Sequence, residues 1–209
     1  MPDLSFTDAP FIQAVVFIAI LIPSVMFHEV AHGFIANKLG DPTARDAGRL
    51  TLNPIAHVDP FGSVILPGLM ALSGGPLFGW AKPVPVNPGR FSNPTAHMAV
   101  TALGGPASNL VLAAVLARVV WPSLSGVPEE IVELLILINV FLAVFNMLPI
   151  PPLDGSRLLP LILPPRAQQI YWQSQQYGFI LLFALLFLFP GSLSFLTDVT
   201  RWILRIIVP

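Results

Sequence analysis

Four apolar stretches, each almost free of charged side chains, dominate this sequence. They cover about residues 10–37, 98–121, 131–147 and 177–191, the last extended by its flanks. A helix needs about 20 mostly apolar residues to cross the hydrocarbon core of a bilayer. A soluble domain carries roughly 25% charged residues, whereas this chain of 209 residues carries 10% and has a mean hydropathy of +0.77. The sequence therefore predicts an all-α polytopic membrane protein.

Two shorter segments interrupt this pattern between the first and second stretches. Residues 61–75 are apolar but short, and Pro67 and Gly68 break them. We interpret them as a re-entrant segment, with a full crossing as the alternative. Residues 76–94 alternate Pro with Val and Trp, which indicates an extended, hairpin-like loop. The 23 prolines and 15 glycines of the chain favour interrupted helices around a cavity.

The C-terminal stretch, about residues 192–208, has its polar side chains on one stripe. Ser194, Asp198, Arg201 and Arg205 are spaced by three or four residues. This spacing predicts a helix that lies in the membrane interface, and a fifth span is the alternative. We therefore expect four to five transmembrane helices in a single domain, 1–209. Its catalytic core covers about 10–160, and C-terminal helices follow over about 170–209.

The basic residues predict how the chain is oriented. With a re-entrant segment at 61–75, one side of the membrane holds Lys38, Arg45, Arg49, Lys82, Arg90, Arg157 and Arg166. The other side holds Arg118, while Arg201 and Arg205 are undecided. Positive residues collect on the cytoplasmic side of membrane proteins. The sequence thus predicts a multi-pass protein of the cell membrane with the first group in the cytoplasm.

Two histidines and a glutamate lie near the end of the first apolar stretch, in "FHEVAH". His28 and His32 are four residues apart, so a helix presents both imidazoles on one face, with Glu29 at its border. An ionisable group in the middle of a membrane helix costs about 2.5 to 3.5 kcal/mol even on the lenient insertion scale. A shared metal ion would offset that cost. In H-E-x-x-H the histidines bind zinc and the glutamate is the general base.

A zinc site needs a further protein ligand. The chain has no cysteine, so the candidates are His57, Asp59, His97 and Asp154. Asp154 follows a proline-rich stretch at the end of the third span, at the same depth as His28 and His32. Asp-Gly is also a common turn pair, so these residues alone leave the ligand and the turn interpretations of Asp154 equally open. For His57 and Asp59, loop capping is favoured over a ligand or ligand-orienting role.

Several ordered motifs resemble one family. "HEVAH", "GGPASN" and "NMLPIPPLDG", together with the connecting "GDPTARDAGRLTLNPIAHVDPFG" and "GWAKPVPVNP", are similar to the site-2 protease family, peptidase family M50. These are intramembrane zinc metalloproteases, and the chain resembles their small prokaryotic branch without PDZ or CBS domains. The resemblance covers about residues 20–160.

The resemblance implies roles for individual residues. One zinc ion per chain would be held by His28, His32 and Asp154, with Glu29 as the general base. Asn146 would be a catalytic residue that stabilises the oxyanion or clamps the substrate backbone. Asn109 is a candidate for substrate binding. For both asparagines, helix–helix hydrogen bonding is the structural alternative.

The resemblance also implies an activity. The family cuts transmembrane helices of other proteins near the cytoplasmic side, in regulated intramembrane proteolysis. The partners would then be membrane-protein substrates and the lipid bilayer, and the net charge of −1 argues against nucleic acid. Residues 76–94 would accept an unwound substrate strand by edge pairing or serve as a structural loop. Two other functions remain: a metal transporter, which would place ligands at several depths, and a non-catalytic binder.

Overall fold

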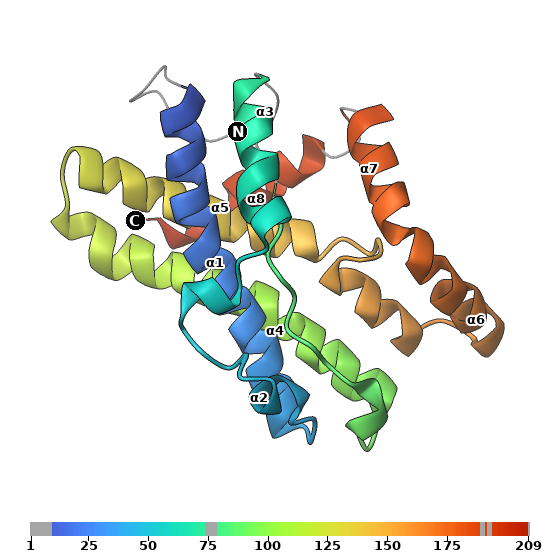
Figure 1. Cartoon of the computed structure of the whole chain (residues 1–209). Coiled ribbons are helices and arrows are strands. Elements are labelled where there is room, and N and C mark those ends of the chain that lie inside the picture. Colours follow the sequence, from blue (N-terminus) through green and yellow to red (C-terminus); the bar gives the residue numbers. More distant parts are fainter. Residues whose placement is uncertain (1–9, 74–78, 189–190, 192–193, 209) are drawn as a thin grey trace.

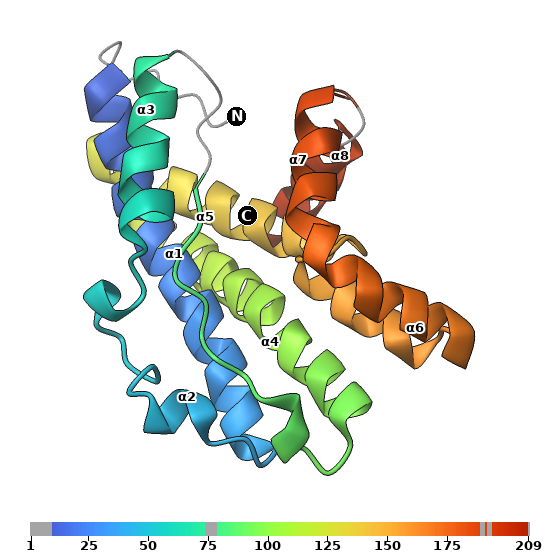
Figure 2. The same ribbon diagram turned by 45° about the vertical axis from the view of Figure 1, so that its right-hand side comes forward.

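The computed structural model describes residues 10–73, 79–188, 191 and 194–208. Every regular element within these ranges is a helix, which confirms the predicted all-α class. Three long helices form the centre: α1 (Pro10–Lys38), α4 (Pro94–Val115) and α5 (Val127–Asn146). Figures 1 and 2 show α1 crossing the pair that α4 and α5 form. The crossing of α1 with α4 is the part of the fold that positions the candidate functional site.

Local sequence explains where the central helices begin. Asn93 caps α4 by accepting a hydrogen bond from the Ala96 amide (3.2 Å), and Pro94 occupies the first turn, where a missing N–H does no harm. Gly126 precedes α5 with φ +67°, a conformation that favours glycine. Glu129 and Glu130 then lie in its first turn, where the positive end of the helix dipole stabilises them.

Two helices of the described chain are long and apolar enough to cross a membrane. They are Ala14–Lys38, within α1, and Pro94–Ser123, in which α4 continues through η4 (Leu116–Val120) and η5 (Trp121–Ser123). The predicted third span corresponds to α5, whose first two turns carry Glu129, Glu130 and Glu133. The predicted fourth span begins as α7 (Gly178–Leu188), and its remaining residues are partly outside the described ranges. The count of four to five spans stays a prediction.

Small residues let α1 and α4 approach closely. A Cβ added to Gly104 would lie 2.5 Å from Ile35 Cδ1 and 3.3 Å from the Ala31 carbonyl oxygen. The hydrophobic effect does not drive helices together inside a membrane, so they associate through such close packing and through hydrogen bonds. The glycines of "GGPASN" therefore bring the backbone of α4 against the helix that carries His28 and His32.

The segment between α1 and α4 doubles back along α1. After α2 (Thr43–Asp46) and η1 (Pro54–Ala56), the chain forms η2 (Pro60–Ile65) and α3 (Leu66–Leu72), which run beside α1. From residue 79 onward the chain returns in extended form to η3 (Pro88–Arg90) (Figure 1). η2 and α3 contain residues 61–72 of the predicted re-entrant segment, and its last two residues, 74 and 75, lie outside the described ranges. Its position in a membrane stays a prediction.

The C-terminal part packs on the central helices. It consists of η6 (Asp154–Leu161), α6 (Pro165–Ser174), η7 (Gln175–Tyr177), α7 and α8 (Ser194–Ile207). Ile203, Leu204 and Ile207 of α8 contact a buried cluster whose members come from three helical elements: Ala113, Ala117, Ile136 and Val140. One face of α8 is therefore covered by protein. This arrangement fits both predictions for the segment, the interfacial helix and the protein-facing span.

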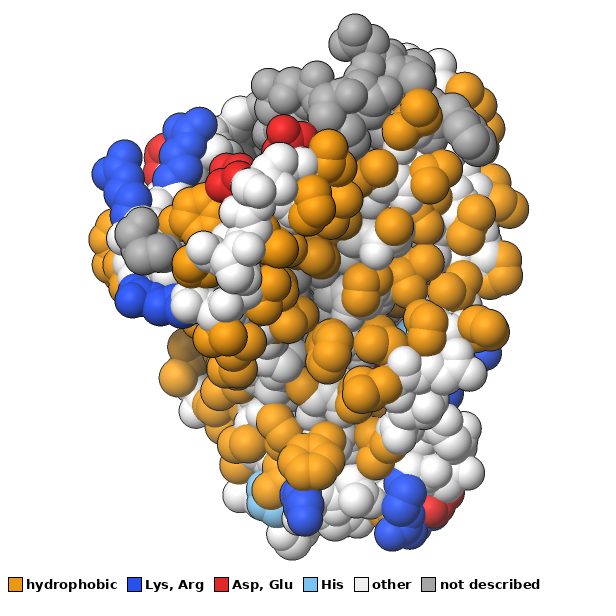
Figure 3. All heavy atoms as spheres, turned by 90° about the vertical axis from the view of Figure 1, so that its left-hand side faces the viewer, with side chains coloured by type: hydrophobic (Ala, Val, Ile, Leu, Met, Phe, Trp, Pro, Cys, Tyr) orange, Lys and Arg blue, Asp and Glu red, His pale blue; other side chains and the backbone are white. Residues whose placement is uncertain are grey.

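The outer surface carries a broad apolar face. Figure 3 shows hydrophobic side chains filling the middle of this face, while most of its charged side chains gather towards its ends. Exposed residues of α1 and α4 include Val15, Phe27, Val111 and Val115. Continuous apolar surface of this extent marks contact with a membrane or another protein. The surface agrees with the membrane protein that the hydropathy predicts.

Asp41 anchors the returning segment to the end of α1. Its carboxylate accepts hydrogen bonds from the Thr43 amide (3.1 Å), the Thr43 hydroxyl and the Asn87 amide (2.6 Å). Burial acts to raise the pKa of the Asp41 carboxyl, but these hydrogen bonds outweigh it and leave the pKa below its usual range. The ionised form therefore stabilises the folded protein.

We predict that Asp41→Asn lowers the thermal midpoint at neutral pH by about 4 to 8 °C, as expected for the loss of about 2 kcal/mol. Because the folded pKa is depressed, the stabilisation is present above the unfolded pKa of about 3.9 and disappears as the pH falls through the folded pKa. Thermal unfolding in detergent measures both effects. Asp46→Asn is the control, since Asp46 is exposed and pairs with its neighbour Arg45; an equal shift in both variants would contradict the anchor.

Candidate metal centre

Three side chains from two distant parts of the chain converge at the crossing of the helices. His28 and His32 lie one turn apart on α1, and their Nε2 atoms are 3.0 Å from each other. Asp154, the first residue of η6, places Oδ2 3.1 Å from His28 Nε2 and 3.2 Å from His32 Nε2. The histidines are 6% and 9% exposed. In the part of the chain that the structure describes, this is the cluster of His and acidic residues that could hold a metal ion.

Asp154 reaches the histidines because the chain folds back at the end of α5. The proline-rich stretch after Asn146 ends the helix, and η6 then packs against α4, with Gly155 close to Met147, the residue that follows α5. A Cβ on Gly155 would lie 2.7 Å from the Leu148 carbonyl oxygen and would overlap the backbone of Met147. The glycine of "LDG" is thus required by close backbone approach. The sequence left Asp154 open between a turn and a ligand, and the structure places it against both histidines.

Hydrogen bonds to the other ring nitrogens define the tautomer of both histidines. His32 Nδ1 lies 2.7 Å from the Thr101 carbonyl oxygen, which can only accept, so Nδ1 carries the proton. His28 Nδ1 lies 2.6 Å from Asn109 Oδ1. The Asn109 Nδ2 group donates to the Ser24 carbonyl oxygen (3.1 Å), so Oδ1 is the atom that faces His28. With its proton on Nδ1, the neutral form of each ring directs the Nε2 lone pair towards Asp154.

The three converging atoms fit a tetrahedral metal ion. When both rings are neutral, two nitrogen lone pairs and the Asp154 Oδ2 atom face one another and repel unless a cation lies among them. Ligands about 2.0 to 2.1 Å from a tetrahedral zinc ion lie about 3.3 Å apart, close to the 3.0 to 3.2 Å found here. His and carboxylate donors in this number also leave one position of a four-coordinate ion open.

Gly105 of α4 forms one wall of this centre. A Cβ at this position would lie 2.5 Å from both Cε1 and Nε2 of His28 and would overlap His32 Nε2. The neighbouring carbonyl of Thr101 and the amide of Asn109 come from the same helix. One surface of α4 therefore both makes room for the imidazoles and orients them.

Glu29 lies beside the ligands but is not one of them. Its Oε2 accepts a hydrogen bond from the Val84 amide at 2.7 Å, which comes from the returning extended segment. Glu29 is half-buried. The contact fixes one carboxylate oxygen and leaves the other for a water or a substrate.

The extended segment directs its hydrogen bonds towards the protein. The amides of Trp80, Lys82 and Val84 donate to Gly62 O (3.1 Å), His57 O (2.9 Å) and Glu29. Alternate residues of an extended chain point to opposite edges, so the other edge carries Pro83 and Pro85, which have no N–H. An incoming strand would find few donors there. The geometry favours the structural-loop interpretation of this segment over strand pairing.

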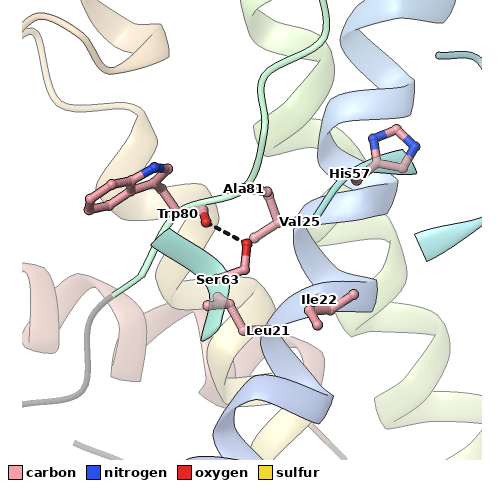
Figure 4. Close-up of a pocket in the computed structure, with 7 residues that line it drawn as sticks. All are labelled: Leu21, Ile22, Val25, His57, Ser63, Trp80 and Ala81. Atoms are coloured by element: carbon pink, nitrogen blue, oxygen red, sulfur yellow. Dashed lines mark hydrogen bonds between the residues drawn. The ribbon is translucent and has the colours of Figure 1, made fainter. Parts of the chain in front are cut away.

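The remaining candidate ligands are used elsewhere. His57 Nε2 bonds to the Thr51 carbonyl oxygen at 2.9 Å, and Asp59 caps η2 by accepting from the Gly62 amide at 2.7 Å. His97 packs edge-on against Phe91. Figure 4 shows His57 and Trp80 on opposite sides of a small pocket, and no member of the His28, His32 and Asp154 cluster lines it. This is the loop-capping role that the sequence favoured for His57 and Asp59.

The two asparagines differ in their surroundings. Asn146 is half-buried at the end of α5, and its Nδ2 donates to the Leu142 carbonyl oxygen at 2.9 Å. Asn109 is fully buried and is held by His28, Ser24 and Asn139. Asn109 is not exposed to a substrate. Its contacts support a role in orienting His28 rather than the substrate contact that the sequence analysis expected. Asn139 was not predicted; its only signal is an amide within the apolar "LILINVFL".

Comparisons with known proteins agree with this centre. The model of "Peptidase family M50" matches residues 123–189, which include Asp154. "Putative zinc metalloprotease YwhC" of Bacillus subtilis is 39% identical over 180 residues, 81% of this chain and 78% of the relative. "Putative zinc metalloprotease Rip2" of Mycolicibacterium smegmatis is 33% identical over 86% of this chain and 71% of the relative. The protein of the same name from Mycobacterium tuberculosis is 32% identical over 94% of this chain and 77% of the relative. No solved structure matches.

We predict that Gly105→Ala removes the bound metal from the purified protein, because the added methyl group occupies the space of the two imidazoles. Metal content by mass spectrometry measures this. Gly68→Ala in α3 is the control, since a Cβ there meets nothing within 4 Å. Full metal occupancy in the Gly105 variant would show that the imidazoles do not bind metal in this arrangement.

Proposed function

This chain belongs to peptidase family M50, and we propose that it is an intramembrane zinc endopeptidase that cuts the membrane-spanning segments of other proteins. The family confirms the resemblance seen in the sequence motifs, and with it the activity of a zinc metalloendopeptidase. The observation that carries the proposal is the buried cluster of His28, His32 and Asp154 with Glu29 at its side.

The residues of the chain divide the work of hydrolysis. His28, His32 and Asp154 would hold the zinc ion, whose chemistry is Lewis-acid activation of the attacking water and of the scissile carbonyl. Glu29 takes the proton from that water and passes it to the departing amine. The Val84 amide holds Glu29 Oε2, so Oε1 is the oxygen that accepts the proton. Asn146 is the candidate for binding the substrate carbonyl or its backbone.

The surroundings support a substrate within the membrane. His28 and His32 lie on α1, one of the two helices that are long and apolar enough to cross a bilayer. His32 is six residues before Lys38, the last residue of α1, which corresponds to about 9 Å along a helix. Water can therefore reach the centre from the basic end without crossing the bilayer. A substrate helix must unwind there first, because its amides are otherwise closed in i to i−4 hydrogen bonds.

We infer a multi-pass protein of the cell membrane whose centre lies near the cytoplasmic side. The end of α1, α2 and η3 lie at one end of the molecule (Figure 1). The basic residues of this end are Lys38, Arg45, Arg49 and Arg90. The positive-inside rule places such an end in the cytoplasm. The loop between α4 and α5 would then lie outside.

The two other functions have less support. A transporter would need ligands at several depths, whereas the described residues provide one cluster at one depth. A non-catalytic metal binder would have no use for Glu29, which is oriented at the metal centre without contributing a ligand atom. An endopeptidase uses both features.

We predict that Glu29→Gln keeps the zinc and lowers cleavage of a membrane-protein substrate by about 10² to 10⁴-fold, the usual contribution of a general base. Comparison of uncut membrane proteins in cells with the wild type and the variant identifies the substrates. Zinc content of the two proteins is the paired measurement. Asp154→Asn serves as the contrasting variant, because it should lose zinc as well as cleavage. Normal cleavage by Glu29→Gln would exclude the general-base role.

Single cysteines test the orientation, since the natural sequence has none. Ala47 and Gln169 are exposed on the side predicted to be cytoplasmic, and Ser125 is exposed in the loop before α5. We expect a membrane-impermeant thiol reagent on intact cells to label Ser125→Cys only. Labelling of all three after permeabilisation is the control. Labelling of Ala47→Cys on intact cells would contradict the predicted orientation.

A further inference from the structure

We propose that a buried relay of three side chains, Ser24, Asn139 and Asn109, holds His28 in the tautomer that binds metal. The proposal deepens the proposed function and rests on it. All three residues are fully buried, and they come from α1, α5 and α4 respectively. Ser24 and Asn139 are positioning residues, since they act on His28 only through Asn109.

The relay begins at backbone carbonyls, which can only accept hydrogen bonds. Asn139 Nδ2 donates to the Leu135 carbonyl oxygen (2.8 Å) and to Ser24 Oγ (2.9 Å). Ser24 Oγ in turn donates to the Ile20 carbonyl oxygen (2.8 Å), so it must accept from Asn139. These contacts fix the Asn139 amide group with its oxygen pointing at Asn109.

The orientation passes from Asn139 to the histidine. Asn139 Oδ1 accepts from Asn109 Nδ2 at 2.7 Å, and the Ser24 carbonyl oxygen accepts from the same nitrogen at 3.1 Å. Two acceptors on one side hold Nδ2 there and turn Oδ1 towards His28 Nδ1, 2.6 Å away. His28 must then carry its proton on Nδ1 and present a lone pair at Nε2.

His28 needs such a relay and His32 does not. His32 is oriented by the Thr101 carbonyl oxygen, which can only accept a hydrogen bond and therefore needs no further group to fix its role. An asparagine amide can turn over, and a turned amide would present its NH₂ group to His28 Nδ1. The proton of His28 would then move to Nε2, the atom that lies 3.1 Å from Asp154 Oδ2, and would block metal binding. Asn139 and Ser24 prevent that rotation.

The same hydrogen bonds also join three helices, so the test separates stability from metal binding. Asn139→Leu removes the closer of the two acceptors of Asn109 Nδ2, at 2.7 Å, and leaves the Ser24 carbonyl at 3.1 Å, with little change of volume. Loss of a group that orients a metal ligand weakens metal binding by about 10 to 100-fold. We expect a zinc dissociation constant about ten-fold higher than wild type, measured on purified protein against a chromophoric chelator. Ser63→Ala is the control, because it loses a buried hydrogen bond to Trp80 O elsewhere and should bind zinc normally.

A second substitution tests the orientation itself. In Asn139→Leu, the additional change Asn109→Asp presents an oxygen to His28 Nδ1 whichever way the group turns, so we expect zinc affinity to recover. A merely structural role of Asn139 would leave the affinity of the double variant as low as that of the single variant. The thermal midpoint of each zinc-free protein is measured alongside and should not recover.

The outcomes distinguish the relay from the proposed function. A wild-type protein that binds no zinc would overturn the proposed function. A wild type that binds zinc, with an Asn139→Leu variant that binds it equally, would overturn the relay alone. Should Asn139→Leu not fold, Ser24→Ala replaces it, because it removes only the hydroxyl that accepts from Asn139. Unchanged zinc affinity in Ser24→Ala would then also overturn the relay.

Discussion

Three electron-rich atoms meet inside the apolar crossing of two helices, and the surrounding structure is arranged to keep them there. His28 Nε2, His32 Nε2 and Asp154 Oδ2 lie 3.0 to 3.2 Å apart with little exposure to water. Such a group is unfavourable without a cation. Gly105 provides the space, and buried hydrogen bonds hold the rings. A site of this kind is maintained by its second layer of contacts as much as by its ligands.

The sequence was informative where the chemistry depends on side-chain type and helical spacing. The four-residue interval of His28 and His32 places them on one face, and the charge-free surroundings of the motif predicted both the helix and the metal. Asp154 required the family resemblance, because an Asp-Gly pair is equally a turn signal. The structure supplies the missing reason: Gly155 permits the close return over the end of α5.

Three features could not be predicted, for different physical reasons. The contact of Glu29 with Val84 uses a backbone amide, which every residue except proline has, so no side-chain pattern marks it. Asn139 is one amide in an apolar helix, and the sequence does not show which of its neighbours it faces. The extended segment was predicted, but the sequence does not show which of its backbone amides point towards the protein and which point away. Only the structure shows that Pro83 and Pro85 occupy the outward edge.

The metal ligands and the general base are neighbours on α1, but different parts of the fold orient them. The ligands and their orienting groups belong to the packed helices α1, α4 and α5 with η6, where the amides of Asn109 and Asn139 are fully enclosed. The base is held instead by a loop segment, whose Trp80, Lys82 and Val84 are tied to the protein by hydrogen bonds. The Val84 amide holds Glu29 Oε2 and leaves Oε1 directed to the water or substrate. The extended segment therefore positions the base, while the packed helices position the metal ligands.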